Sequence, residues 1–175
     1  SLSFEVKSGE KIVITGFNGI GKTTVLKTLM GKIKPFSGTF KFADYVKINY
    51  FEQDLKWGND ELTPIQIVRE NFPNFTEQEI RKQLAICAIS SKNATQKLKT
   101  LSGGEQSKVK LCLFANRKSN FLIMDEPTNH LDVDSKEVLR EQLKKWEGNL
   151  ILVSHEENFY NTWIDKIINL KNYLR

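Results

Sequence analysis

The sequence predicts an α/β fold in which helices connect the strands of a largely parallel sheet. Short apolar strands alternate along the chain with stretches of helical periodicity, and this alternation is typical of βαβ units. The chain has 175 residues, of which 39% are hydrophobic and 27% charged, so we expect one globular domain with a proper core. It contains no apolar run near the roughly 20 residues of a membrane span, so we expect no direct membrane insertion.

The first third of the chain predicts one buried strand, one helix and a small antiparallel β part. Residues 11–15 (KIVIT) contain an unbroken apolar run at 12–14, which indicates a buried strand. Residues 22–30 have helical periodicity, and Gly31 is the expected end of this helix. The segments 38–43 and 45–51 alternate apolar and polar residues, which favours antiparallel strands.

The middle of the chain, from about residue 54 to 100, predicts a helical subdomain inserted into the α/β core. This stretch is polar, and residues 76–79 (TEQE) match a capping box that opens the helix IRKQLAICAI. The core itself is expected over about 1–53 and 101–175. After residue 101 the alternation resumes, with expected strands at 121–124, 150–153 and 166–170 and expected helices at 134–146 and from about 156.

Charge and cysteine content narrow the class of protein only slightly. The net charge of +5 is compatible with a nucleic-acid partner, but a lysine-rich solvated surface explains it equally well. Cys87 and Cys112 lie in apolar helical patterns and have no Cys or His neighbour at metal-ligand spacing. We therefore expect both to be buried, reduced thiols of a cytoplasmic protein.

Residues 16–23 (GFNGIGKT) match the phosphate-binding loop, which has two glycines, a lysine and a threonine at fixed spacing. Backbone N–H groups in such a loop form a concave nest, and the following helix N-terminus adds partial positive charge. Lys22 can reach the β- and γ-phosphates of a nucleotide, and the Thr23 hydroxyl can bind Mg²⁺. The alternative is a chance match, which the predicted strand before the loop and helix after it disfavour. The expected nucleotide-binding residues here are Gly16, Asn18, Gly19, Gly21, Lys22, Thr23 and Thr24.

Two acidic residues follow the buried strand FLIM, at the sheet edge where doubly wound folds bind their ligands. Asp125 is suited to hold Mg²⁺, usually through water. Glu126 can accept a proton from an attacking water, and such help is typically worth roughly 10²–10⁴-fold in rate. If these two acids were the only signal, they could equally be solvated residues of a loop. Because a phosphate loop lies about 100 residues upstream, they indicate a Walker B element.

A second glycine pair occurs in residues 101–106 (LSGGEQ). Ser102 and Glu105 have the spacing of a capping box, which predicts a helix starting near Gly103 with free N–H groups. Such a helix start attracts anions. A helix cap requires Ser102 and Glu105 but not Gly103 and Gly104, so the glycine pair favours a second anion site. The alternative is a helix N-terminus that has two glycines but binds no ligand.

Taken in order, GFNGIGKTT, LSGGEQ, LIMDEP and VSHE resemble an ATP-binding cassette (ABC) nucleotide-binding domain, a P-loop ATPase. The resemblance covers nearly the whole chain and implies ATP and Mg²⁺ as ligands. It implies that Ser102, Gly103 and Gly104 form the signature motif, which contacts ATP held by a partner cassette. It also implies that Asp132 is the D-loop aspartate of the dimer interface.

The same resemblance implies three catalytic residues and three metal ligands. Gln53 resembles the Q-loop glutamine near Mg²⁺ and the attacking water, and His155 resembles the switch histidine after the last core strand. With Glu126 they form the expected catalytic set. The expected metal ligands are Thr23, Gln53 and Asp125.

Further stretches are similar to class F cassettes (ABC-F), especially the second cassette of those proteins: EPTNHLD, YFEQD, LTPIQIVRENFP, TEQEIRKQL and HEENFY. The resemblance implies a cytoplasmic protein with two cassettes, no membrane domain and a role on the ribosome. The partner would be a second cassette, on the same chain or in a homodimer, with ribosomal RNA as a further partner. The ATPase subunit of a membrane transporter is an alternative. Another is a nucleotide sensor without hydrolysis, which Glu126 and His155 disfavour.

The resemblance also implies an aromatic residue that stacks on adenine upstream of the phosphate loop; only fifteen residues precede Gly16, and we expect this adenine platform to be missing from them. Residues 1–6 (SLSFEV) read as the middle of a strand, so we expect an N-terminally truncated cassette. Base stacking contributes roughly 1–3 kcal/mol. We therefore expect weak nucleotide affinity and little hydrolysis from this piece alone.

Overall fold

The structure is a computed structural model that describes residues 2–52, 54 and 56–173. The chain divides into two compact units. The first comprises residues 1–53, 118–127 and 138–175, and the second comprises residues 54–117 and 128–137. The residues expected to form a helical subdomain fall in the second unit, together with the following helix. Each unit has its own hydrophobic core.

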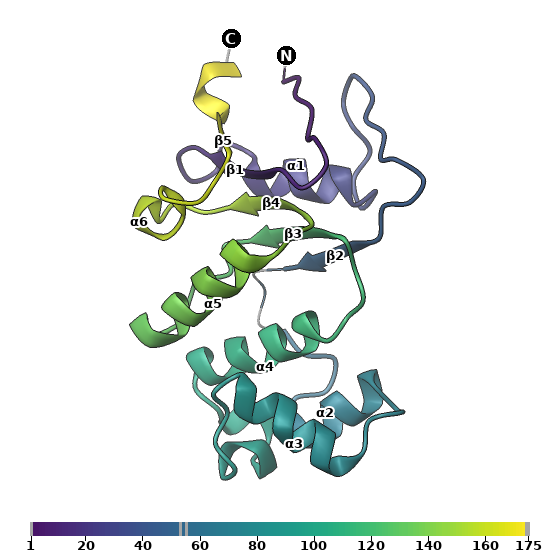
Figure 1. The fold of residues 1–175 in the computed structure, drawn as a ribbon, viewed down its shortest axis with the longest axis vertical. Helices are drawn as coiled ribbons and strands as arrows, with labels where there is room; N and C mark the ends of the chain where they lie inside the picture. Colours follow the sequence, from purple (N-terminus) through teal and green to yellow (C-terminus); the bar gives the residue numbers. More distant parts are fainter. Residues whose placement is uncertain (1, 53, 55, 174–175) are drawn as a thin grey trace. The chain divides into compact units, whose positions relative to one another are not determined.

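The first unit is built on a five-stranded parallel sheet with the order β2-β3-β4-β1-β5 (Figure 1). All of its strand pairs are parallel. Because parallel strands run in one direction, the residues that follow them lie at one edge of the sheet, where ligands bind in such folds. The strands are β1 Lys11–Thr15, β2 Ile48–Phe51, β3 Phe121–Asp125, β4 Asn149–Val153 and β5 Lys166–Asn169.

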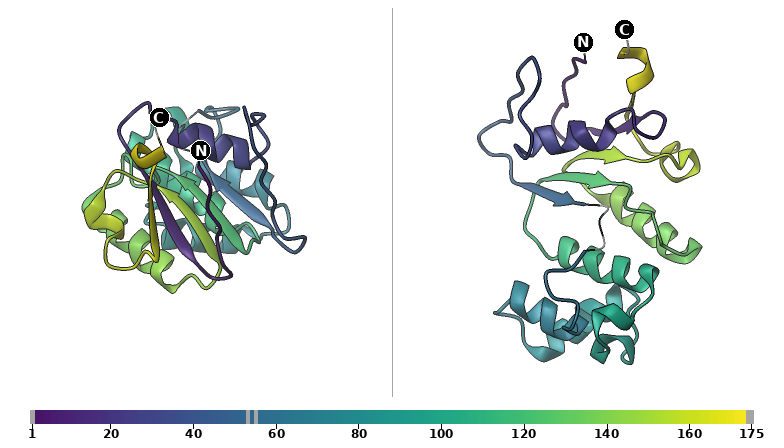
Figure 2. Two further views of the ribbon diagram at one scale, coloured as in Figure 1. Left: turned by 90° about the horizontal axis from the view of Figure 1, so that it is seen from above. Right: turned by 180° about the vertical axis from the view of Figure 1, so that it is seen from behind.

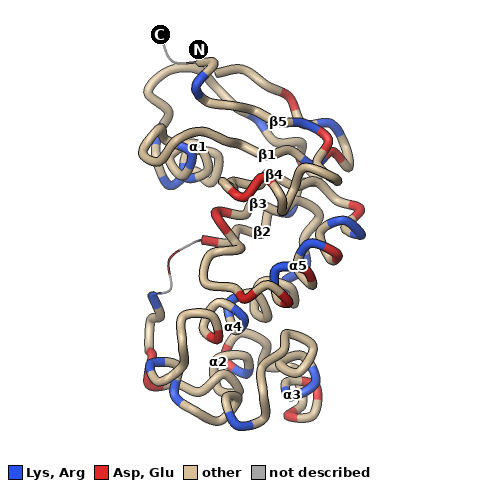
Figure 3. The backbone as a smooth tube through the Cα atoms, turned by 90° about the vertical axis from the view of Figure 1, so that its left-hand side faces the viewer, with Lys and Arg blue, Asp and Glu red and all other residues tan. Residues whose placement is uncertain are grey.

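Helices cover both faces of this sheet. Helix α1 (Lys22–Leu29) lies on one face and α5 (Val133–Lys145) on the other, with α6 (Glu157–Tyr160) following β4 (Figures 1 and 2). On the α1 face, Leu26 is fully buried in a cluster with strand residues that include Ile14 and Ile123. Burying such side chains stabilises the unit by about 1.5–3 kcal/mol each. Along α5, charges of both signs follow one another closely, as expected of a solvated helix (Figure 3).

The predicted antiparallel β part is wrong for the residues that the structure describes. Residues 38–43 form no strand, and β2 pairs with β3 in parallel. The side chains of 38–43 are mostly exposed, and no strand pairs with this segment in the described structure. A strand without neighbours is not stable in water, so alternation alone does not produce one here. Residues 2–6, expected within a strand, form none either.

The second unit is helical, with α2 (Pro64–Asn71), α3 (Glu77–Ile86) and α4 (Gly103–Ala115) (Figure 2). Two 3₁₀ turns, Asn93–Thr95 and Leu98–Thr100, lie between α3 and α4. The predicted capping box of Thr76 and Glu79 is confirmed. Helix α2 begins with another one, at Thr63 and Gln66, that sequence analysis did not single out. The core of the unit contains Ile65, Ile67, Val68, Ile80, Leu84, Ile89, Ala94, Leu98, Leu101, Val109, Cys112 and Leu113.

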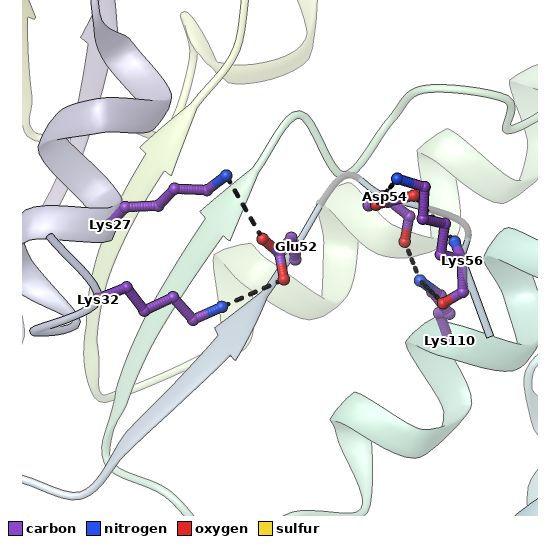
Figure 4. Close-up of polar contacts among 6 residues, drawn as sticks. All are labelled: Lys27, Lys32, Glu52, Asp54, Lys56 and Lys110. Carbon is purple, nitrogen blue, oxygen red and sulfur yellow. Dashed lines mark hydrogen bonds and ion pairs between the residues drawn. The ribbon is translucent and has the colours of Figure 1, made fainter. Parts of the chain in front are cut away.

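Polar contacts link the start of the second unit to α4. Lys110 Nζ donates to the backbone carbonyl of Asp54, and Lys56 Nζ lies 3.6 Å from Asp54 Oδ2 (Figure 4). Trp57 Nε1 donates to Gln106 Oε1 at 2.7 Å. The predicted free thiols are confirmed, although only Cys112 is fully buried and Cys87 is half-buried. Within the described residues, no helix has the length and apolar character that crossing a membrane requires.

Candidate functional site

The phosphate loop joins β1 to α1 in a backbone conformation that favours glycine. Gly21 is the N-cap of α1, with φ 107° and ψ 17°. The φ angles of Gly16 and Gly19 are 147° and 84°. L-amino acids rarely adopt these angles. In the described part of the chain, the amides of Gly19, Gly21 and Lys22 donate to no protein acceptor, so they are available to an anion.

Lys22 is folded into this loop. Its side chain is buried, and Nζ donates to the carbonyls of Gly16 at 2.9 Å and Phe17 at 3.3 Å. Phosphate oxygens are negatively charged and would bind the same ammonium group more strongly than these neutral carbonyls do. Of the other predicted loop residues, Asn18 lies in the turn and Thr24 in the first turn of α1.

Asp125, at the end of β3, is only 1% exposed, and its Oδ1 has no hydrogen-bond partner among the described residues. Burial raises the pKa of this carboxyl above its usual value, and a hydrogen bond from the Thr23 hydroxyl opposes the rise. A buried carboxylate is costly unless a counter-charge is present. Thr23 and Asp125 offer oxygen donors, which suit Mg²⁺. The residues present therefore fit the predicted ion.

Glu126 and His155 form a pair beside this carboxylate. The Glu126 side chain is 8% exposed, and its Oε2 lies 2.9 Å from Nδ1 of His155. An ionised carboxylate only accepts hydrogen bonds, so Nδ1 is the donor and Nε2 of the half-exposed ring remains available. Glu126 has a φ of 46°, an uncommon value for a residue other than glycine. Such backbone strain is concentrated at functional sites.

The signature residues lie at the start of α4, in the second unit. Ser102 Oγ accepts from the Glu105 amide at 3.3 Å, and Glu105 Oε2 accepts from the Ser102 amide at 2.9 Å, so the predicted capping box is confirmed. Among the described residues, the amides of Gly103 and Gly104 have no protein acceptor. A Cβ on Gly104 would lie 2.6 Å from the carbonyl oxygen of His130, so one glycine is required by packing.

Asp132 has partners within the second unit. Its Oδ1 accepts from the Ser135 amide at 2.8 Å, and Lys108 Nζ lies 3.0 Å from Oδ2. The Ser135 hydrogen bonds and the Lys108 ammonium hold the pKa of Asp132 well below its usual range. Asp132 therefore caps the first turn of α5, besides any role at an interface. The Lys108 contact was not predicted, because residues 24 apart give no pairing signal in sequence.

The structure thus brings together, in the first unit, the phosphate-loop residues with Asp125, and Glu126 with His155. The signature residues and Asp132 belong to the second unit. Gln53, predicted to be catalytic and a metal ligand, lies outside the described residues. Sequence reasoning missed Tyr50 on β2, whose buried hydroxyl is coupled electrostatically to Asp125. Tyr50 can be related to Asp125 only when the pairing of β2 with β3 is known.

Comparison with known proteins shows the family to which the chain belongs. The family model described as "ABC transporter" matches residues 1–129 of the 175. "Uncharacterized ABC transporter ATP-binding protein YfmM" of Bacillus subtilis is 45% identical over 159 residues, 91% of this chain and 30% of the relative. "ABC transporter F family member 2" of Arabidopsis thaliana is 36% identical over 169 residues, 95% of this chain and 25% of the relative.

A solved structure has the same fold: the "complex of archaeal ribosomal stalk protein aP1 and archaeal ribosome recycling factor aABCE1", with a TM-score of 0.75 and 26% identity. The match covers 94% of this chain and 32% of that one. This chain spans less than a third of the length of the two curated relatives. The family match extends through the phosphate loop, the signature segment and the Walker B acids, so the chain belongs to the ABC family as a nucleotide-binding cassette with class F relatives.

Proposed function

We propose that this cassette hydrolyses ATP between two cassettes that close on each other, as half of a cytoplasmic class F protein acting on the ribosome. The observation that carries the hydrolytic part is the Glu126–His155 pair next to Asp125, at the sheet edge where the phosphate loop ends. A protein that only sensed nucleotide would not need a buried carboxylate held by an imidazole.

The chain's own residues divide the chemistry among them. Lys22 and the free loop amides bind the phosphates and stabilise the charge that develops on them. Glu126 accepts the proton of the attacking water, and His155 stabilises the charge that develops on the transferring phosphoryl group. Thr23 and Asp125 would hold Mg²⁺, which neutralises phosphate charge when bound.

The free amides at the start of α4 support closure onto a second cassette. They form an anion site in the second unit, whereas the phosphate loop belongs to the first. In the proposed sandwich, each α4 start faces the phosphates bound by the partner. The partner is a second cassette of the same full-length chain or a second copy.

The ribosome is proposed from the relatives. The class F relative and the archaeal recycling factor both align along nearly the whole chain. The net charge of +5 is compatible with contact to RNA phosphates. Co-sedimentation of the Glu126→Gln protein with ribosomes in ATP tests this part; failure to sediment would remove the ribosome and leave hydrolysis in place.

The hydrolytic part is tested by two substitutions. Lys22→Ala should abolish or strongly weaken ATP binding in a calorimetric titration, and Lys34→Ala, at an exposed lysine, should not. Glu126→Gln should retain ATP but lower turnover by roughly 10²–10⁴-fold. Undiminished turnover in Glu126→Gln would remove the general base from the proposal.

A further inference from the structure

Two buried polar atoms of the first unit have no hydrogen-bond partner among the described residues: the Tyr50 hydroxyl and Oδ1 of Asp125. Buried polar groups are nearly always hydrogen-bonded, and an exception calls for an explanation such as a bound water or ion. A bound Mg²⁺ would account for the missing hydrogen-bond partner of Asp125 Oδ1. The hydroxyl of Tyr50 has no such explanation yet.

The sheet places both side chains on the same face. Tyr50 of β2 is directly opposite Ile123 of β3, and Asp125 follows Ile123 by two residues. Side chains two apart on a strand share a face, as do directly paired residues of neighbouring strands. Tyr50 packs against the hydrophobic cluster that includes Leu26 of α1 and Ile123, so this is the face covered by α1. Thr23, which hydrogen-bonds Asp125, is also on α1.

The hydroxyl of Tyr50 stays neutral at this position. Burial, followed by the charges of Asp125 and Glu52, raises the pKa of Tyr50 well above its usual value. A neutral phenol can both donate and accept a hydrogen bond. It can therefore donate a hydrogen bond to a water molecule or accept one from it.

Contacts with α1 and the residues after it hold the end of β2 in place. Lys32 Nζ lies 4.7 Å from the centre of the Tyr50 ring and 3.2 Å from Glu52 Oε2. Lys27 Nζ lies 3.8 Å from Glu52 Oε1, so Glu52 is held between two lysines (Figure 4). Each partly exposed ion pair contributes little stability alone. Lys32 therefore contacts both the Tyr50 ring and the Glu52 carboxylate, at the end of β2.

We propose that Tyr50 is a positioning residue of the magnesium site, whose hydroxyl binds a water of the ion that Thr23 and Asp125 hold. Mg²⁺ in proteins usually keeps several waters, so one hydrated ion can satisfy both unpartnered atoms. This inference rests on the proposed function, because it assumes the complex with metal and ATP.

The test replaces Tyr50 with Phe, which removes only the hydroxyl. The experiment uses the full-length protein that contains this cassette and follows Mn²⁺ binding to its ATP complex by electron paramagnetic resonance. The affinity for Mn²⁺ should fall roughly 3- to 10-fold, which is the effect of losing one hydrogen bond. The Mg²⁺ concentration for half-maximal turnover should rise by a similar factor. ATP binding in EDTA should be unchanged. Tyr45→Phe is the matched control, since Tyr45 is 68% exposed, and it should alter none of these.

Thermal unfolding without metal is the check on folding. Tyr50→Phe should be at least as stable as wild type, because it removes an unsatisfied buried group. Unchanged Mn²⁺ affinity in Tyr50→Phe would overturn the proposal and assign the hydroxyl to an internal water. Equal weakening of ATP binding in EDTA would overturn it too, in favour of a packing role. A wild-type protein that binds no metal–ATP complex would instead refute the proposed function itself.

Discussion

At the scale of single residues, the glycine pair of the signature segment has two different roles. Gly104 lies against backbone: a Cβ there would meet the carbonyl oxygen of His130 at 2.6 Å. A Cβ on Gly103 would have the His130 side chain as its nearest neighbour, at an ordinary 3.7 Å. His130 itself has a φ of 67°, an uncommon backbone conformation for a residue other than glycine. The approach of α4 to this residue therefore selects glycine at one position only.

Alanine at these two positions should have opposite effects on the free energy of unfolding. We expect Gly104→Ala to destabilise the protein by about 1–3 kcal/mol, because the backbone of His130 must move. Gly103→Ala should be neutral or stabilising by up to about 1 kcal/mol, since alanine favours the helix. Urea unfolding of both variants measures this. Equal stability of the two would show that the close approach is relieved at no cost.

The residues of the site differ in how far sequence alone predicts them. Lys22, Asp125 and Ser102 belong to motifs whose spacing carries their chemistry, so they were predicted without any structure. Tyr50 was not, because its relation to Asp125 depends on which strand β2 pairs with and in which register. The clash that selects Gly104 was also hidden, since it involves the backbone of a residue 26 positions away.

At the scale of elements, helix starts were predicted well and one pair of strands was not. A capping box is local: Glu79 Oε2 accepts from the Thr76 amide at 2.7 Å, within four residues of sequence. Strand pairing is not local. Alternation over 38–43 resembles a strand, but a strand needs a neighbour, and none pairs with these residues in the described structure.

The capping box of α3 should make stability depend on pH in a defined window. Hydrogen bonds from Thr76, its amide first, hold the pKa of Glu79 below its ordinary value of 4.5. The ionised form therefore stabilises the folded state above the unfolded pKa, and this contribution disappears as pH falls through the lower folded pKa. Wild type should exceed Glu79→Gln in melting temperature at about pH 6, and the difference should shrink steadily as pH falls below 4.5. A difference that is constant with pH would exclude the carboxylate as its source.

At the scale of the whole molecule, the described part of the cassette has free backbone amides at two helix starts, one in each unit. The phosphate loop and the start of α4 each have backbone amides without protein acceptors in the described structure. One triphosphate bound by one cassette can engage the α4 start of another. This shared ligand is what would couple ATP binding to closure, and hydrolysis to opening.

Retention of nucleotide in Glu126→Gln tests that coupling. If the α4 start faces a partner's phosphate, a fluorescent ATP analogue should dissociate slowly from this variant. Adding Ser102→Asp should release it at least roughly tenfold faster, because a negative charge would lie near the phosphate. Aspartate is as good an N-cap as serine, so α4 itself is retained. Ser102→Asn has a similar shape and caps as well without the charge, so it should keep the analogue bound. Equal release from Asp and Asn variants would mean that no phosphate lies at this helix start.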